Sequence, residues 1–312
     1  MRTFFVDLVN IIFRPKRYAA SANLYFRDWF HSFSRILFSS EVKKRDELDQ
    51  QNNTTPLFQL SEKIGHLRIG SLFDEKLKQE VIAEARRIMQ IEMTPDFVAK
   101  FANAPFVSIP IQGPLSPENP FLKFALHKPL LKALTRYFSI LPVIENISIW
   151  YSPNDRDLSG SSQLYHLDGQ DVKTIQLFLF IEDVDTENGP LVVVDAERSV
   201  QIAKSIGYRK TKILKRVDDE LIRAKAEPSE VIQATGSAGE CYIVDTDRCF
   251  HFGSRKASRP RYLVVFQYYT PFAFVLPWKW WKKLPYAHLG ESDRFSPIER
   301  AVLGRPATHP GV

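Results

Sequence analysis

Tyr165-His166-Leu167-Asp168-Gly169, followed directly by Val172–Ile181 (VKTIQLFLFI), is the part of the sequence that decides the fold. The second stretch contains no Pro or Gly and is rich in β-branched and aromatic residues, which is typical of a buried strand. Residues two apart on an extended chain project to the same side, so His166 and Asp168 can reach one metal ion together. The sequence therefore predicts a metal-binding pair where the chain enters a sheet.

A second histidine, His251, follows the strand-like stretch 239–245 (GECYIVD) and precedes another, 261–269 (RYLVVFQYY). Two imidazoles and one carboxylate on one face of a metal leave three adjacent coordination positions open, as in Fe(II) oxygenases. A His-x-Asp tripeptide alone is common by chance, and a hydrogen-bonded surface pair is its alternative interpretation. The predicted strands around both histidines favour the metal site.

Short β-prone runs separated by polar turns fill residues 145–271, with a further short strand expected at 191–194. This pattern predicts a mainly β fold with surrounding helices: a double-stranded β-helix, or cupin-like jelly roll, preceded by N-terminal helices. Residues 74–90 read as an amphipathic helix that begins at an Asp cap. The metal ligands should lie at the open mouth of the barrel.

The stretch 145–271 resembles the phytanoyl-CoA dioxygenase-like family of Fe(II)/2-oxoglutarate-dependent oxygenases. The similar segments are HLD at 166–168, NGPLVVV at 188–194, AGECYIVDTDRCFHFGS at 238–254 and RPRYLVVFQY at 259–268, with 121–138 as the counterpart of an upstream helix.

The resemblance implies that His166, Asp168 and His251 are the iron ligands. It also implies that Arg261 binds the distal carboxylate of 2-oxoglutarate, a task that suits the planar two-pronged guanidinium. Arg259 is the competitor for this role, and the Pro-Arg order favours Arg261.

Gln163 either reaches the proximal end of 2-oxoglutarate or is a polar loop residue that faces solvent. The implied cofactors are Fe(II), 2-oxoglutarate as cosubstrate and O2, and the implied reaction is hydroxylation of a C–H bond with decarboxylation of 2-oxoglutarate to succinate. Related halogenases carry a small residue in place of Asp168, so a carboxylate here favours hydroxylation, with desaturation or epimerisation as further outcomes. A non-catalytic jelly-roll interaction module, or a metal-dependent isomerase or lyase on the same barrel, are the alternative functions.

The chain has 312 residues, 44% hydrophobic and 25% charged, which is ordinary for a globular protein with one large core. Two cysteines, Cys241 and Cys249, make no disulfide framework, and packing in the core, in preference to a redox role, is expected for Cys241.

The formal charge of +6 is concentrated at the N-terminus: residues 1–45 hold nine Lys/Arg and three Asp/Glu, a difference of +6. Large apolar residues recur there at helical spacing. We therefore expect a basic, amphipathic helical extension at 1–45, a linker at 46–59, the oxygenase jelly-roll domain at 60–275 and an aromatic and basic tail at 276–312.

The helices of 1–45 either pack on the core with their basic residues in water or lie on an anionic membrane surface, helped by the Trp- and Lys-rich stretch 276–283. A cytoplasmic protein, peripheral at the inner face of a membrane in the second case, is expected. The sequence has no nucleic-acid-binding motif, so no nucleic-acid partner is predicted. The substrate is expected to be a small molecule, lipid-like or anionic; the basic run 204–216 would suit an anion, or is simply a solvated surface.

Overall fold

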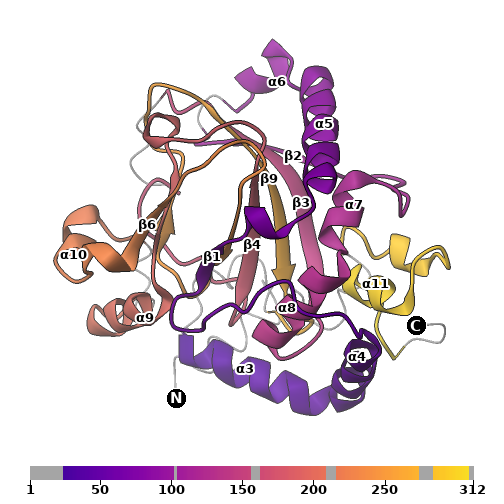
Figure 1. Cartoon of the computed structure of the whole chain (residues 1–312). Helices are drawn as coiled ribbons and strands as arrows, with labels where there is room; N and C mark the ends of the chain where they lie inside the picture. Colours follow the sequence, from indigo (N-terminus) through magenta and orange to yellow (C-terminus); the bar gives the residue numbers. More distant parts are fainter. Residues whose placement is uncertain (1–23, 102–103, 156–161, 209–215, 274–283, 309–312) are drawn as a thin grey trace.

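The computed structural model describes residues 24–101, 104–155, 162–208, 216–273 and 284–308 (Figure 1). Two antiparallel sheets face each other, one six-stranded in the order β1-β7-β4-β9-β3-β2 and one three-stranded in the order β6-β5-β8. The strands are β1 (His66–Arg68), β2 (Val107–Pro110), β3 (Val143–Ser152), β4 (Thr174–Phe180), β5 (Leu191–Val194), β6 (Val231–Ala234), β7 (Cys241–Asp245), β8 (His251–Phe252) and β9 (Arg261–Tyr269).

From β3 onward the chain alternates between the two sheets in the manner of a jelly roll. After β3 in the large sheet, Tyr165 and His166 form bridges at the edge of the small sheet, and β4 returns to the large one. The pair β5 and β6 belongs to the small sheet, and β7, β8 and β9 then alternate between the two. The predicted double-stranded β-helix is confirmed, and the predicted strands at 172–181, 191–194, 239–245 and 261–269 are β4, β5, β7 and β9.

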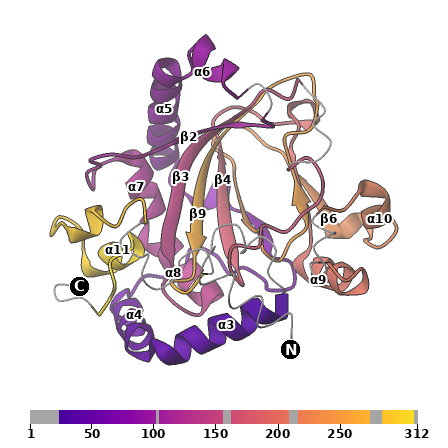
Figure 2. The same cartoon turned by 180° about the vertical axis from the view of Figure 1, so that it is seen from behind.

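Helices surround the two sheets, some on their outer faces and others across their ends, as Figures 1 and 2 show from opposite sides. They are α3 (Leu24–Leu37), α4 (Ser39–Gln51), α5 (Glu75–Glu92), α6 (Pro95–Ala99), α7 (Pro120–Ala125), α8 (Lys128–Phe138), α9 (Ala196–Ser205), α10 (Asp219–Arg223) and α11 (Pro297–Val302), with 3-10 turns at Gly70–Leu72, Thr186–Asn188, Pro228–Glu230 and Leu289–Glu291. The large sheet is backed by α5, α7 and α8, and the small sheet by α9 and α10.

Three hydrophobic layers result from this stacking. The largest lies between the helices and the large sheet and includes Val81 of α5, Leu134 of α8 and Phe266 of β9. A second, with Phe178 and Val193, fills the space between the two sheets. Alternate side chains of one strand point to opposite faces, so β4 serves two layers at once: Leu177 and Leu179 face the helices while Phe178 faces the small sheet. The site is built into the inner layer.

Two predicted helices can be compared directly with the structure. The helix expected at 74–90 is α5, and the Asp74 side chain caps it by accepting a 3.0 Å hydrogen bond from the amide of Leu77. The helix expected at 121–138 is instead two helices, α7 and α8. Pro129 stands in the first turn of α8, where its missing N–H could not have continued a helix from α7.

The boundary predicted at residue 45 is wrong, because α4 runs through it and the first residues of the predicted linker are helical. Arg45 explains why this polar helix is part of the core. Its side chain is fully buried, pairs with Glu41 at 2.8 Å and donates hydrogen bonds to the carbonyls of Leu141 and Ala301. Arg27 on α3 is buried as well. A packed extension was expected to keep its basic residues in water, and for these two arginines that expectation is wrong.

The predicted tail 276–312 is also part of the core where the structure describes it. Ile298, Ala301 and Leu303 lie in the largest hydrophobic layer, and α11 packs against α4. Residues 1–23 and the Trp- and Lys-rich stretch 276–283 lie outside the described residues. None of the helices in the described part of the chain is both long and apolar enough to cross a bilayer.

Candidate metal centre

His166 and His251 lie directly opposite each other at the edge of the small sheet. The amide of His166 donates to the carbonyl of His251 at 3.0 Å, and the amide of His251 returns a bond to His166 at 3.1 Å. Directly opposed residues of an antiparallel pair project to the same face. The two imidazoles therefore lie side by side, with ring centroids 4.3 Å apart, although 85 positions separate them in the chain.

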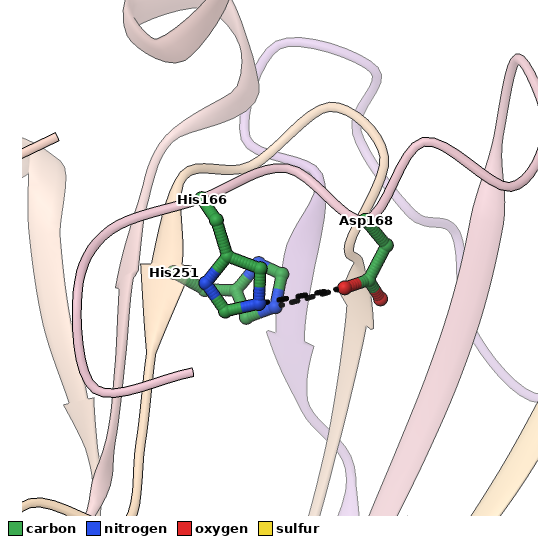
Figure 3. A group of neighbouring side chains, drawn as sticks. All are labelled: His166, Asp168 and His251. Carbon is green, nitrogen blue, oxygen red and sulfur yellow. Dashed lines mark ion pairs between the residues drawn. The ribbon is translucent and has the colours of Figure 1, made fainter. Parts of the chain in front are cut away.

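Asp168 completes the group from the loop that leads into β4, and Figure 3 shows its carboxylate pointing at both rings. Its Oδ1 lies 3.5 Å from Nε2 of His166 and 3.7 Å from Nε2 of His251. The three candidate ligand atoms lie within 4.8 Å of one another. Metal–ligand bonds of about 2.1 Å at right angles would separate the donor atoms by about 3 Å, so a small contraction suffices to bind a divalent ion.

Both imidazoles have the tautomer that a metal requires. Nδ1 of His166 lies 2.9 Å from the carbonyl oxygen of Leu164, and Nδ1 of His251 lies 3.0 Å from that of Cys249. A carbonyl oxygen can only accept, so each Nδ1 carries the proton. Each Nε2 then directs a lone pair toward Asp168, and the backbone holds the orientation of both rings.

The pKa values of the group favour the deprotonated ligands that a metal needs. Burial and the neighbouring His166 lower the pKa of His251 to about 4, so its imidazole is neutral at physiological pH. Burial by itself raises the pKa of Asp168, but hydrogen bonding from neighbouring side chains and the attraction of the carboxylate to the two histidines outweigh it and hold the pKa below its usual range.

Arg261 lines the same pocket as the three ligands, beside Gly253 and Ser254. Its Nη2 donates to the Ser254 hydroxyl at 2.9 Å, whereas its Nε and Nη1 have no hydrogen-bond partner among the described residues. The guanidinium is 4% exposed, and burial lowers its pKa to about 10, so it still carries its charge at neutral pH. A Cβ on Gly253 would lie 3.2 Å from Nη2, so the glycine leaves room for the guanidinium. A buried cation with unused donors fits the carboxylate of a bound acid.

The two other residues considered for the cosubstrate lie elsewhere. Arg259 is half exposed on the outside, where it forms an ion pair with Asp185, so it does not compete with Arg261 for the pocket. Gln163 is buried, and its amide donates to the carbonyl of Ser254 at 2.6 Å. It therefore supports the backbone beside Arg261 and does not face solvent.

Gln176 on β4 was not predicted as part of the site. Its amide donates a 2.9 Å hydrogen bond to Oδ2 of Asp168, and the side chain lines the pocket. A signal did exist, because Gln176 is the polar member of an otherwise apolar strand interior (TIQLFLF). A buried polar group in that position needs a partner, but the sequence does not say which one.

Aromatic side chains form the wall of the pocket next to the metal ligands. Trp150 stacks on Phe106 with ring centroids 4.4 Å apart and meets Phe178 edge to face at 6.1 Å. The indole N–H of Trp150 donates to the Ser148 hydroxyl at 2.8 Å, which fixes the ring in place. The pocket thus combines a polar end, at the three ligands and Arg261, with an apolar wall.

No protein-family profile matches the chain, and no curated protein sequence matches it either. Solved structures with some similarity exist. The α-ketoglutarate-dependent epimerase SnoN from nogalamycin biosynthesis is 13% identical with a TM-score of 0.41, over 67% of this chain and 80% of that chain. HygX from Streptomyces hygroscopicus, with nickel and 2-oxoglutarate bound, is 14% identical with a TM-score of 0.44, over 68% and 88%. EctD from S. alaskensis is 13% identical with a TM-score of 0.42, over 67% and 74%. Values this low do not carry an activity from those proteins to this chain.

Proposed function

We propose that this chain is an Fe(II)/2-oxoglutarate-dependent oxygenase. Two imidazoles and a carboxylate, here His166, His251 and Asp168, are the donor set of non-haem Fe(II) enzymes and leave three adjacent positions for other ligands. The observation that carries the proposal is the presence of Arg261 in the same pocket, buried and with two unused donor atoms. A metal site alone would not need that cation, whereas a metal-bound dicarboxylic acid would.

The proposed reaction converts 2-oxoglutarate, O2 and a substrate R–H into succinate, CO2 and R–OH. One oxygen atom enters succinate and the other enters the product, so the atoms balance. The metal supplies redox chemistry when bound, and the chain's own residues orient the reactants and exclude water. Arg261 binds the distal carboxylate, and the aromatic wall of Phe106, Trp150 and Phe178 accommodates an apolar part of the substrate. We therefore propose a small substrate with an apolar, lipid-like portion.

Two measurements on the purified protein test this function. Anaerobic addition of Fe(II) and 2-oxoglutarate should produce a visible charge-transfer absorption band, and admission of O2 should then release succinate. His166→Ala should abolish both. A wild-type protein that binds neither component would instead support a non-catalytic jelly-roll module. Iron binding without 2-oxoglutarate binding would support the isomerase or lyase alternative.

We also propose that α3 contacts an anionic membrane surface. Trp29, Phe33, Ile36 and Leu37 form one stripe along this helix and are 42%, 42%, 75% and 51% exposed. Phe30, beside the stripe, and Arg27 and Ser34, on the other side of the helix, are buried. Residues 1–45 carry a surplus of six positive charges, or five when Arg27, which is buried against Asp247, is left out, and this surplus complements anionic lipid headgroups.

Cosedimentation with phosphatidylcholine vesicles, with and without phosphatidylserine, tests the membrane contact. The wild-type protein should sediment with the anionic vesicles, and Trp29→Ser combined with Ile36→Ser should prevent this. Ile91→Ser is the matched control, because Ile91 is 59% exposed on α5 and lies outside the stripe. A dimer that the double substitution dissociates, with no vesicle binding, would assign the stripe to a second copy of the chain and contradict the proposal.

A further inference from the structure

The Asp247 side chain organises the loop that follows the metal ligand Asp168. Asp247 lies four residues before His251 in the turn between β7 and β8, and its carboxylate accepts hydrogen bonds from three successive backbone amides, those of residues 169–171. The bonds from the second and third amides measure 2.9 and 2.7 Å. The hydroxyl of Thr174, at the start of β4, donates to the same carboxylate. A buried carboxylate that accepts four hydrogen bonds fixes the path of the whole loop.

The same loop and turn are also joined through the backbone of the metal ligand itself. The amide of Asp168 donates to the carbonyl of Thr246 at 3.0 Å, and the amide of Thr246 donates to the carbonyl of Thr174 at 2.9 Å. The segment that carries the carboxylate ligand and the turn that leads to His251 therefore form one hydrogen-bonded unit. Its centre is the Asp247 carboxylate.

Arg27 of helix α3 attaches to this unit from a position 220 residues away in the sequence. Its Nη1 lies 2.7 Å from the carbonyl oxygen of Asp171 and 3.2 Å from Oδ1 of Asp247. The arginine is 3% exposed, and the Asp247 side chain is fully buried. Arg27 thus supplies the positive charge that balances the Asp247 carboxylate, and its bond to the carbonyl of Asp171 holds the end of the loop.

We propose that Arg27 and Asp247 are positioning residues for the metal centre. They keep the loop 168–171 in the conformation that directs Asp168 at His166 and His251. This inference rests on the metal site of the proposed function and is independent of 2-oxoglutarate. Residues that orient metal ligands without touching the metal typically contribute about 10- to 100-fold to metal affinity, so a loss of that size is expected when the pair is broken.

Arg45 provides a matched control for Arg27. Both are buried arginines from the N-terminal helices, both pair with a carboxylate, and both donate to backbone carbonyls. Arg45 donates to Glu41 and to the carbonyls of Leu141, Pro142 and Ala301, none of which belongs to the metal-site loop. Arg27→Met and Arg45→Met should therefore both lower the melting temperature, whereas only one of them should change the metal site.

The experiment is an anaerobic titration of the full chain with Co(II), followed by the visible absorption of the bound ion, with melting temperatures recorded in parallel. Arg27→Met should weaken Co(II) binding about 10-fold or more, Arg27→Lys should restore part of the affinity, and Arg45→Met should leave it within about twofold. If Arg27→Met does not fold, Thr174→Val serves instead, since it removes one hydroxyl bond to Asp247 at nearly constant volume; it should weaken Co(II) binding measurably.

Two outcomes are distinguishable failures. In the first, Arg27→Met, or Thr174→Val in its place, lowers the melting temperature but keeps the wild-type affinity for Co(II). The pair would then be a purely structural ion pair, and the inference would be overturned while the proposed function would stand. A wild-type chain that binds no Co(II) would overturn the metal centre and the proposed function together.

Discussion

Gln176 donates its side-chain hydrogen bond to Oδ2 of Asp168, which leaves Oδ1 as the atom that faces both imidazoles. The two oxygens of one carboxylate therefore have different tasks. With Oδ2 engaged, Asp168 offers the metal a single oxygen, and one carboxylate oxygen with two Nε2 atoms makes the three-atom face that leaves the other positions free.

Gln176→Leu should weaken metal binding about 10-fold, because Asp168 would lose the partner that fixes its orientation. Thr135→Val is a suitable comparison: Thr135 is also a buried polar residue, but its hydroxyl donates to the carbonyl of Leu131 within α8 and not to the metal-site loop. Isothermal titration with Fe(II) or Co(II) measures the difference. Equal effects of the two substitutions would show that the bond to Asp168 has no special role.

Arg261→Met should raise the Kd for 2-oxoglutarate about 100-fold or more, since it removes a charge-assisted contact worth about 3 kcal/mol, while the affinity for the metal should change little. Arg259→Met should change neither, because Arg259 is half exposed and pairs with Asp185. The intensity of the Fe(II)/2-oxoglutarate absorption band as a function of 2-oxoglutarate concentration gives the Kd for 2-oxoglutarate, and its intensity as a function of Fe(II) concentration gives the affinity for the metal. A loss of 2-oxoglutarate binding in Arg259→Met alone would reverse the assignment.

The titration of His31 should lower the stability of the metal-free protein as the pH drops from about 6.5 to about 4. Burial, with Arg35 and Lys173 adding to it, lowers the pKa of His31 to about 4. The folded state therefore binds this proton less readily than the unfolded state, so the stabilisation is complete above pH 6.5 and is lost toward pH 4. The full shift corresponds to about 3 kcal/mol.

His31→Gln removes this titration. Relative to the wild type, the free energy of unfolding of the variant at about pH 4, compared with its value at about pH 7, should be about 2 to 3 kcal/mol more favourable to the folded state, as measured by urea unfolding. The nearby Asp171 carboxyl, 3.9 Å from His31, is protonated in the folded state over this range, because burial raises its pKa to about 8, so it does not restore the pKa of His31. Its own titration stabilises the folded state as the pH falls, but it is present in both proteins and cancels in the comparison of the variant with the wild type. An unchanged slope in the variant would remove His31 as a cause.

Cys241 and Cys249 should both be inert to thiol reagents in the native protein. Neither forms a disulfide, both side chains are fully buried, and burial raises the pKa of each thiol. Ellman's reagent should detect no thiol under native conditions and two after denaturation. A native signal would show that the strand leading to His251 opens to solvent.

The residues of the candidate metal site could be selected from the sequence because local patterns mark them, and the structure brings them together. His166 and Asp168 lie two residues apart before an apolar strand. His251 is the first residue of β8, and Arg261 is the first residue of β9. The jelly roll was predictable for a similar reason, since a buried strand such as β4 requires an uninterrupted β-prone run that is visible without coordinates.

Tertiary structure alone decided which polar groups support those ligands. Arg27 and Arg45 looked like the basic face of an extension, yet each is buried on a carboxylate and on carbonyls contributed by segments remote in the chain. Likewise, the sequence shows that Gln176 is a polar residue in an apolar strand, but it does not show that Asp168 is its partner. Periodicity reports which side of an element faces the core, whereas the partner of a buried charge depends on which remote segment the fold places beside it.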